Sequence, residues 1–150
     1  AFEAFADSYY SQCSIKNVEM GYDFTNAEFG EKVKSCVLFL IEDDGPYLIH
    51  CKEGKDRTGM LCAILECFTG ASLDEVKADY MATYRNFYHI GQADETYGII
   101  LRNNLVKTLC ALFGVEDLET ANLREKAGSY LNSIGLTEKQ LDALKMKLGA

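Results

Sequence analysis

The stretch that decides the fold is YLIHCKEGKDRTGMLCAILECFTG, residues 47–70. It opens with a short apolar run, residues 47–50, which follows the turn sequence Glu-Asp-Asp-Gly-Pro at residues 42–46. A run of this kind after a turn is typical of a β-strand. A polar loop containing glycine comes next, and the apolar residues 59–68 then predict a helix that stops at Gly70. The stretch therefore predicts a strand, a loop and a helix in immediate succession.

The rest of the chain has the pattern of helices separated by turns. N-caps are available at Asn26, at Thr137 and at Ser72, which forms a capping box with Glu75. The aromatic side chains spaced along the helix after Ser72, Tyr84 among them, are interpreted as core packing. The expected helices cover residues 2–12, 27–42, 72–88, 93–113, 118–134 and 137–148.

A single strand is an incomplete structure, because its backbone donors and acceptors need partners. Either further strands are hidden in segments such as residues 15–24, or the sequence is the C-terminal part of a longer protein whose upstream residues supply the rest of the sheet. We favour the second alternative. The expected architecture is an α/β fold, with a helix-rich C-terminal portion around a mostly parallel sheet. Residues 1–150 are expected to form one domain, because no linker or repeat divides them.

The composition argues against several classes of function. The formal net charge of −8 disfavours a nucleic-acid binder, which needs clustered Lys and Arg to neutralise phosphates. No window is apolar enough to span a membrane, so stable membrane insertion is not expected. With 2 histidines and no Cys-x-x-Cys pair, neither a metal site nor a cofactor is predicted. The first residues lack a signal-peptide pattern, so the cytoplasm is the expected compartment, although a removed signal peptide leaves no trace. The oligomeric state is not indicated.

The loop of residues 51–58 combines groups that bind a phosphate. A helix N-terminus offers an anion its backbone N–H groups and the positive end of its dipole. Gly54 can adopt a positive φ, which lets the loop curl until its N–H groups face one centre. Arg57 adds a planar, permanently charged fork that can bind two phosphate oxygens. The predicted phosphate-binding residues, besides Arg57, are Lys52, Glu53, Gly54, Lys55 and Thr58.

Cys51 has the position of a nucleophile. Thiols at helix N-termini beside cationic groups have pKa values lowered from about 8.5 to roughly 3.5–7.5, so Cys51 is expected to be ionised at neutral pH. A thiolate beneath a bound phosphate can attack phosphorus in line and form a phosphocysteine, which water then hydrolyses. The Thr58 hydroxyl can donate to the sulfur in both steps. The His50 side chain is expected to orient the loop by a hydrogen bond to the backbone rather than to act as a base, because an ionised thiolate needs none.

The loop also matches a known signature. His50, Cys51, Gly54, Arg57, Thr58 and Gly59 fit the pattern HCxxGxxRTG, which resembles the protein tyrosine phosphatase superfamily. The string GKDRTG is similar to the loop of a bacterial subgroup of tyrosine and phosphoinositide phosphatases. Residues 78–87 and 130–148 are similar to the helical C-terminal part of that subgroup. The resemblance implies a phosphatase-like fold around a mostly parallel sheet, with its usual upstream strands missing, and hydrolysis of phosphotyrosine or other phosphomonoesters.

The general acid follows from the resemblance. In most superfamily members an aspartate on a separate upstream loop protonates the leaving group. Asp23 lies in the corresponding region, but its surroundings do not match the usual motif of that loop. In the subgroup with the GKDR string the aspartate inside the loop is thought to take this role, and Asp56 occupies that position. We therefore predict Cys51 as nucleophile, Asp56 as general acid and Arg57 as the residue that stabilises the transition state.

Two other functions remain as alternatives. One is a non-catalytic module that reads phosphotyrosine or phosphoinositide headgroups, and the intact Cys51 and Arg57 weigh against it. The other is a rhodanese-like sulfurtransferase, against which His50 and the Arg-Thr-Gly sequence weigh. The expected partner is a phosphorylated protein or a phosphoinositide substrate. Positive charge from Lys52 and Lys55 at the rim of the pocket suits multiply phosphorylated substrates such as phosphoinositides.

Overall fold

The computed structural model describes residues 8–150 of the chain, and these residues form helices joined by turns and extended segments. The part of the expected helix 2–12 that falls in residues 1–7 lies outside the described residues; its remainder is a single 3-10 turn. In chain order the helices are η1 (Tyr9–Gln12), α2 (Ala27–Glu42), α3 (Asp56–Thr69), α4 (Leu73–Tyr88), α5 (Glu95–Ile100), the π-helix η2 (Leu101–Val106), α6 (Lys107–Phe113), α7 (Leu123–Ser133) and α8 (Glu138–Leu148).

The expected α/β fold around a mostly parallel sheet is wrong, because residues 8–150 contain no strand and no sheet. The apolar run 47–50 is extended, but a strand needs a neighbour about 4.8 Å away. The other extended segment, residues 14–20, lies across a cleft from it. The side chains of Tyr47 and Ile49 pack against the helical core instead, and the Tyr47 hydroxyl donates to the carbonyl oxygens of Leu40 and Asp43 at 2.8 and 2.7 Å.

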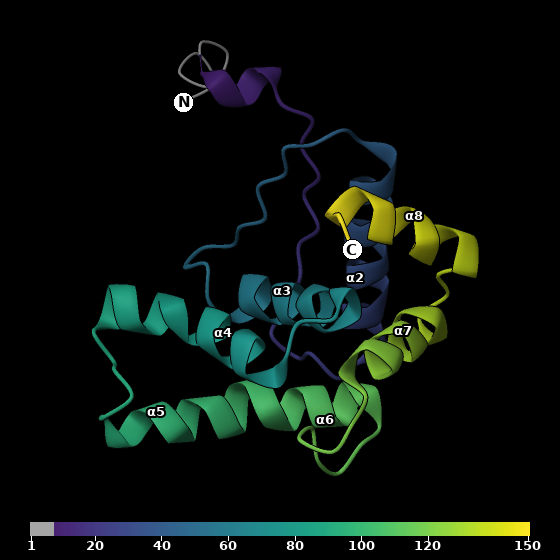
Figure 1. Ribbon diagram of the computed structural model, residues 1–150. Helices are drawn as coiled ribbons and strands as arrows, with labels where there is room; N and C mark the ends of the chain where they lie inside the picture. Colours follow the sequence, from purple (N-terminus) through teal and green to yellow (C-terminus); the bar gives the residue numbers. More distant parts are fainter. Residues whose placement is uncertain (1–7) are drawn as a thin grey trace.

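Helix α3 is the centre of the molecule (Figure 1). Its buried side chains point in all directions around the helix axis, which is typical of a helix enclosed by others. α4 and α7 pack against it, and Phe68 lies between α3 and the later helices. Gly70 ends α3 in the left-handed conformation with φ of 100°, as the sequence predicts. A loop that precedes α3 is therefore held by the most deeply packed element.

Two further groups of helices surround α3. α5, η2 and α6 form one continuous helical rod that runs beside α4, with η2 in contact with α4 (Figure 1). α2 packs on α8, and the Lys147 ammonium of α8 donates to the Asp43 carbonyl and the Asp44 carboxylate just after α2. Among residues 8–150, no helix is long and apolar enough to cross a membrane.

Most helix predictions agree with the structure, and the local caps explain why. Asn26 accepts a hydrogen bond from the Phe29 N–H at 2.8 Å, and α2 has the predicted bounds. The capping box at Ser72 is present at the start of α4. The prediction for residues 118–134 is too long, because α7 begins only after its cap Asn122. The helix predicted from residue 59 begins three residues earlier, at Asp56, so part of the expected loop is the first turn of α3.

Candidate active site

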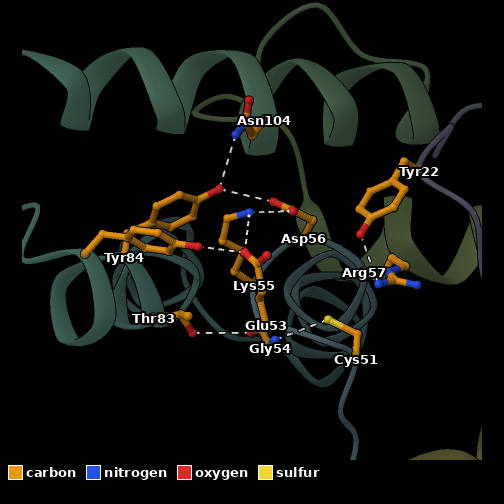
Figure 2. A network of polar contacts seen from close by, with 11 residues as sticks. Tyr22, Cys51, Glu53, Gly54, Lys55, Asp56, Arg57, Thr83, Tyr84 and Asn104 are labelled. Atoms are coloured by element: carbon orange, nitrogen blue, oxygen red, sulfur yellow. Dashed lines mark hydrogen bonds and ion pairs between the residues drawn. The ribbon is translucent and has the colours of Figure 1, made fainter.

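The segment between Cys51 and α3 curls back over the cysteine sulfur. Gly54 has a φ of 69°, in the left-handed region that favours glycine, and its N–H donates to Cys51 Sγ at 3.2 Å (Figure 2). Lys55 precedes the first residue of α3, so the sulfur lies beside the N-terminus of this helix. The predicted curl of the loop is present, and it directs a backbone donor at the sulfur.

The surroundings of Cys51 favour its thiolate. Partial burial acts against ionisation and would raise the pKa of Cys51. The Thr58 hydroxyl and the backbone N–H groups of Thr58, Glu53 and Gly54 stabilise the negative charge more strongly, and the pKa falls to about 6. By contrast, burial raises the pKa of Cys67 to about 12 and that of Cys62 to about 11. Cys51 is therefore largely ionised at neutral pH, while the thiols of Cys62 and Cys67 stay protonated.

Arg57 and Thr58 carry polar atoms without partners. The Arg57 Nε and the Thr58 Oγ1 are buried and, among residues 8–150, neither has a hydrogen-bond partner that meets ordinary geometry. Buried polar groups are nearly always satisfied in folded proteins, and an unsatisfied charged donor is costly. Both atoms belong to the first turn of α3, beside the cysteine. An anion bound at this turn would satisfy the Arg57 Nε, whereas the Thr58 hydroxyl is the donor that stabilises the Cys51 thiolate.

The rest of the Arg57 guanidinium contacts the extended segment before α2. Its two terminal nitrogens donate to the Met20 carbonyl at 3.4 Å and to the Tyr22 hydroxyl at 3.0 Å, and the Tyr22 ring lies 4.6 Å from Arg57 Cζ. Figure 2 shows Tyr22 reaching the guanidinium from a different element. Sequence reasoning missed both contacts, because they join residues 37 and 35 positions apart.

Glu53, Lys55 and Asp56 form a network of charges at the other side of the loop. The Lys55 ammonium lies 2.7 Å from the Asp56 carboxylate and 3.2 Å from that of Glu53 (Figure 2). The Asp56 hydrogen bond is the main reason that the pKa of Lys55 is raised, although burial opposes it. Lys55 therefore stays charged, and its charge is balanced by two carboxylates of the same loop. Lys52, in contrast, is exposed.

Helix α4 donates three side-chain hydrogen bonds to the same loop. From the sequence, the aromatic side chains of this helix were assigned to core packing, and Thr83 was not considered. The Thr83 hydroxyl donates to the Gly54 carbonyl at 3.3 Å, the Tyr84 hydroxyl to Asp56 Oδ1 at 3.2 Å and the Tyr88 hydroxyl to Glu53 Oε2 at 2.6 Å. The aromatic spacing on α4 was the available signal, since tyrosine combines a packing ring with a polar tip. The loop conformation thus depends on α4.

Two further residues considered from the sequence have local roles. His50 Nδ1 lies 3.4 Å from the Cys51 carbonyl oxygen, a contact that forms when this nitrogen carries the proton. Asp23, the distant candidate for the acid, accepts hydrogen bonds from the N–H and the hydroxyl of Thr25 at 3.1 and 3.0 Å. The Asp23 carboxylate is therefore engaged in the turn before α2.

Cys51, Arg57 and Thr58 open into a cleft of about 830 Å³. Its walls are the extended segments 13–20 and 47–52 and the C-terminal half of α2. Basic side chains at its edge include Lys16, His50 and Lys52. The cleft is within the size range of ligand-binding pockets, about 300–1,000 Å³. A thiolate, an unsatisfied arginine donor and an accessible cleft together form a site suited to an anion.

A loop that curls over a thiolate at a helix N-terminus is the arrangement of an anion-binding enzyme site, and comparison with known families shows which class of enzyme this is. The model of the tyrosine phosphatase family matches residues 6–150. The chain therefore belongs to the tyrosine phosphatase family and is a phosphatase. No curated protein and no solved structure matches the chain.

Proposed function

We propose that the protein hydrolyses phosphomonoesters, phosphotyrosine among them, through a covalent intermediate on Cys51. Three features support this proposal. The pKa of Cys51 is lowered to about 6, the Arg57 Nε is a buried donor without an acceptor among residues 8–150, and both groups face one cleft. The unsatisfied Arg57 Nε carries most weight, because a bound phosphate oxygen is the acceptor it lacks. Residues 1–150 act as one phosphatase domain in this proposal.

The proposed reaction has two displacements at phosphorus. In the first, the Cys51 thiolate attacks, the S–P bond forms, the bond to the leaving oxygen breaks, and Asp56 gives that oxygen a proton. In the second, Asp56 takes a proton from water, the water oxygen bonds to phosphorus, and the S–P bond breaks. Inorganic phosphate and the thiolate are the products. Arg57 and the backbone N–H groups of residues 52–57 hold the equatorial oxygens in both steps.

The substrate class is proposed from the charges at the cleft. Because Lys55 is paired with Glu53 and Asp56, Lys52 is the lysine of the loop that is exposed to meet a second phosphate. This arrangement favours a singly phosphorylated group such as phosphotyrosine over a multiply phosphorylated inositol. A panel of phosphopeptides and phosphoinositides at matched concentrations distinguishes the two. A higher kcat/KM for the phosphoinositides would reverse this preference without affecting the role of Cys51.

The first test concerns the nucleophile. The wild-type protein is expected to hydrolyse p-nitrophenyl phosphate without added metal, and Cys51→Ser to reduce kcat by at least about 10³-fold, because a neutral hydroxyl replaces a thiolate. Cys67→Ser, at a buried thiol inside α3, is the matched control and should keep the activity. Trapping of ³²P on the wild-type chain, and not on Cys51→Ser, would identify the phosphocysteine. Equal turnover by wild type and Cys51→Ser contradicts the enzymatic mechanism and favours a phosphate-binding module.

The second test concerns the proton donor. Asp56→Asn should lower kcat for phenyl phosphate, whose leaving group needs a proton, by roughly 10²–10⁴-fold, the usual range for general acid–base catalysis. Binding of inorganic vanadate should change little, because the Cys51 thiolate and Arg57 remain in place. Asp23→Asn is the control, and it should leave kcat near the wild-type value. Normal turnover by Asp56→Asn, with a large loss in Asp23→Asn, would assign the acid to Asp23.

A further inference from the structure

A chain of hydrogen bonds leads from the π-helix to the predicted acid. The Asn104 amide donates to the Tyr84 hydroxyl at 3.3 Å, and that hydroxyl donates to Asp56 Oδ1 at 3.2 Å. Lys55 donates to the other oxygen, Oδ2, at 2.7 Å. Figure 2 shows the Asp56 carboxylate turned toward Tyr84 and Lys55, with Asn104 reaching Tyr84 from the helix above it.

The direction of these bonds follows from the chemistry of the groups. An amide –NH₂ can only donate, so the Tyr84 oxygen accepts from Asn104 and its single proton is left for Asp56. Burial raises the pKa of Tyr84, the Asn104 hydrogen bond opposes this, and the negative charge of Asp56 raises the pKa further, so the hydroxyl keeps its proton at neutral pH. A carboxylate has about four lone-pair sites, and the two bonds leave one on each oxygen for the transferred proton. The contacts therefore hold the Asp56 carboxylate and leave each oxygen a lone pair for a proton, while Asp56 itself lies outside the lining of the cleft beside Cys51.

Tyr84 is a rigid support. Its side chain is 5% exposed, and its ring lies 5.9 Å from that of Tyr80 and 6.0 Å from that of Tyr88. A tyrosine packed between two rings has few rotamers, so its hydroxyl has a fixed position. Lys55, on a flexible stem at the end of the loop, cannot fix the carboxylate in the same way.

The π-helix explains how Asn104 reaches Tyr84. η2 lies inside the rod that runs beside α4, and Asn104 is one of its residues. A π turn contains about one residue more than an α turn, so it changes which side chains face the neighbouring helix. Such turns are frequent at functional sites. Asn104 is itself exposed, and its substitution leaves the core packing unchanged.

We propose that Tyr84, held by Asn104, is the positioning residue for the Asp56 carboxyl group. Tyr84 is not among the residues that line the cleft, so it acts through Asp56 by fixing its rotamer. The inference rests on the proposed function in taking Asp56 as the group that moves the proton. It places the support of the loop on α4 and the π-helix, two elements outside the signature motif.

The test uses two substrates that differ in their need for an acid. Phenolate, with a pKa of about 10, needs a proton as it leaves, whereas the far more acidic p-nitrophenol does not. Tyr84→Phe should lower kcat for phenyl phosphate by about tenfold, the factor of one hydrogen bond to a charged group. For p-nitrophenyl phosphate the loss should stay below about twofold. KM for both substrates should change little. Asn104→Ala should act in the same direction, by about threefold.

The controls separate positioning from a general effect on the fold. Tyr130→Phe, at a tyrosine that is 8% exposed on α7, should behave as wild type. Tyr88→Phe removes the bond to Glu53 and should not change the ratio of kcat between the two substrates. The proposal is overturned if Tyr84→Phe, like Tyr88→Phe, lowers kcat for phenyl phosphate and for p-nitrophenyl phosphate by the same factor. Tyr84 would then be a structural contact only. If Tyr84→Phe does not fold, Asn104→Ala decides the same question, because Asn104 is the exposed residue at the outer end of the hydrogen bonds that lead to Asp56.

A readout independent of activity completes the test. Three-bond couplings measured by NMR should report one χ1 rotamer for Asp56 in the wild-type protein and averaging among rotamers in Tyr84→Phe. A single unchanged rotamer in Tyr84→Phe overturns the positioning role, whatever the kinetics. If the wild-type protein shows no turnover at all, the proposed function fails, and the couplings still decide whether Tyr84 holds Asp56.

Discussion

At the scale of single residues, the reactivity of Cys51 depends on a few donors around its sulfur. The N–H groups of Glu53 and Gly54 belong to the backbone and cannot be removed without altering the loop, but the Thr58 hydroxyl can. That hydroxyl is buried and has no partner of ordinary geometry among residues 8–150. Its proton is therefore available to the thiolate, which makes Thr58 the simplest point at which to change the pKa of Cys51.

We predict that Thr58→Val raises the pKa of Cys51 from about 6 by roughly one unit, the effect of one hydrogen bond to a charged atom. Only the thiolate reacts with iodoacetamide, so the loss of activity on alkylation should have its midpoint near pH 6 in wild type and at higher pH in Thr58→Val. Alkylation at pH 6 becomes slower in the variant, because less thiolate is present. Thr58→Ser keeps the hydroxyl and should keep the wild-type midpoint. An identical midpoint in Thr58→Val would show that the backbone amides alone stabilise the sulfur.

At the scale of elements, the loop is positioned by the contact between α3 and α4, and Gly59 makes that contact close. A Cβ at Gly59 would lie 2.9 Å from the ring of Tyr80, which is 3% exposed and part of the hydrophobic core. A Cβ at Gly128, in the middle of α7, would lie 3.7 Å from the Phe68 ring, which is an ordinary contact. Both glycines lie inside helices, but only Gly59 is required by a close contact with a neighbouring side chain.

Alanine substitutions at these glycines should have opposite effects on stability. Ala is favoured over Gly inside a helix by about 0.5–1 kcal/mol, whereas an extra methyl group in a packed core costs about 1–3 kcal/mol. Urea denaturation should therefore show a lower free energy of unfolding for Gly59→Ala and a gain of about 0.5–1 kcal/mol for Gly128→Ala. Gly59→Ala should also lower phosphatase activity, because it displaces α4 from the loop. A stability gain in both variants would mean that the Tyr80 ring moves aside easily.

Elements with strong local signals could be predicted from the sequence, and those that depend on neighbours could not. Asn26 and the Ser72 capping box mark helix starts through contacts three residues apart, so α2 and α4 were predictable. The start of α3 was placed too late, because its polar first turn has the composition of a loop. The strand at residues 47–50 was wrong, since pairing depends on a second segment that the apolar pattern does not reveal.

For the candidate site, too, local features could be predicted and long-range contacts could not. Residues 51–58 form a local motif, so the curl at Gly54 and the place of Cys51 at the head of a helix could be predicted from spacing. The contacts of this loop with Tyr22 and Tyr84 span 35 and 28 positions, and no local pattern encodes them. The pairing of Lys55 with two carboxylates was also missed, because side-chain direction within the loop depends on α4.

At the scale of the whole molecule, the loop of residues 51–58 contacts segments that are far apart in the sequence. The loop contacts the extended segment near Tyr22, the C-terminal turns of α4 and, through Tyr84, the π-helix. The net charge of −8 gives an anion no general attraction, so binding depends on these local donors. The unfolded chain has no such anion site, because the N–H groups of residues 51–58 converge only in the folded loop. An anion that binds there must therefore stabilise the whole fold.

We accordingly expect inorganic vanadate, a phosphate analogue, to raise the resistance of the protein to urea. A ligand that binds only the folded state adds about 2.7 kcal/mol to the free energy of unfolding at one hundred times its Kd. Arg57→Met should lose most of this gain, because the buried Nε that lacks an acceptor among residues 8–150 is removed. Arg102→Met, at an exposed arginine of η2, is the matched control and should keep it. For each variant, the free energy of unfolding with vanadate is compared with that of the same variant without it. The stability that Arg57→Met loses with the Tyr22 contact is present in both measurements and therefore cancels. An equal gain in Arg57→Met and wild type would place the anion elsewhere on the molecule and contradict the assignment of this loop as the phosphate site.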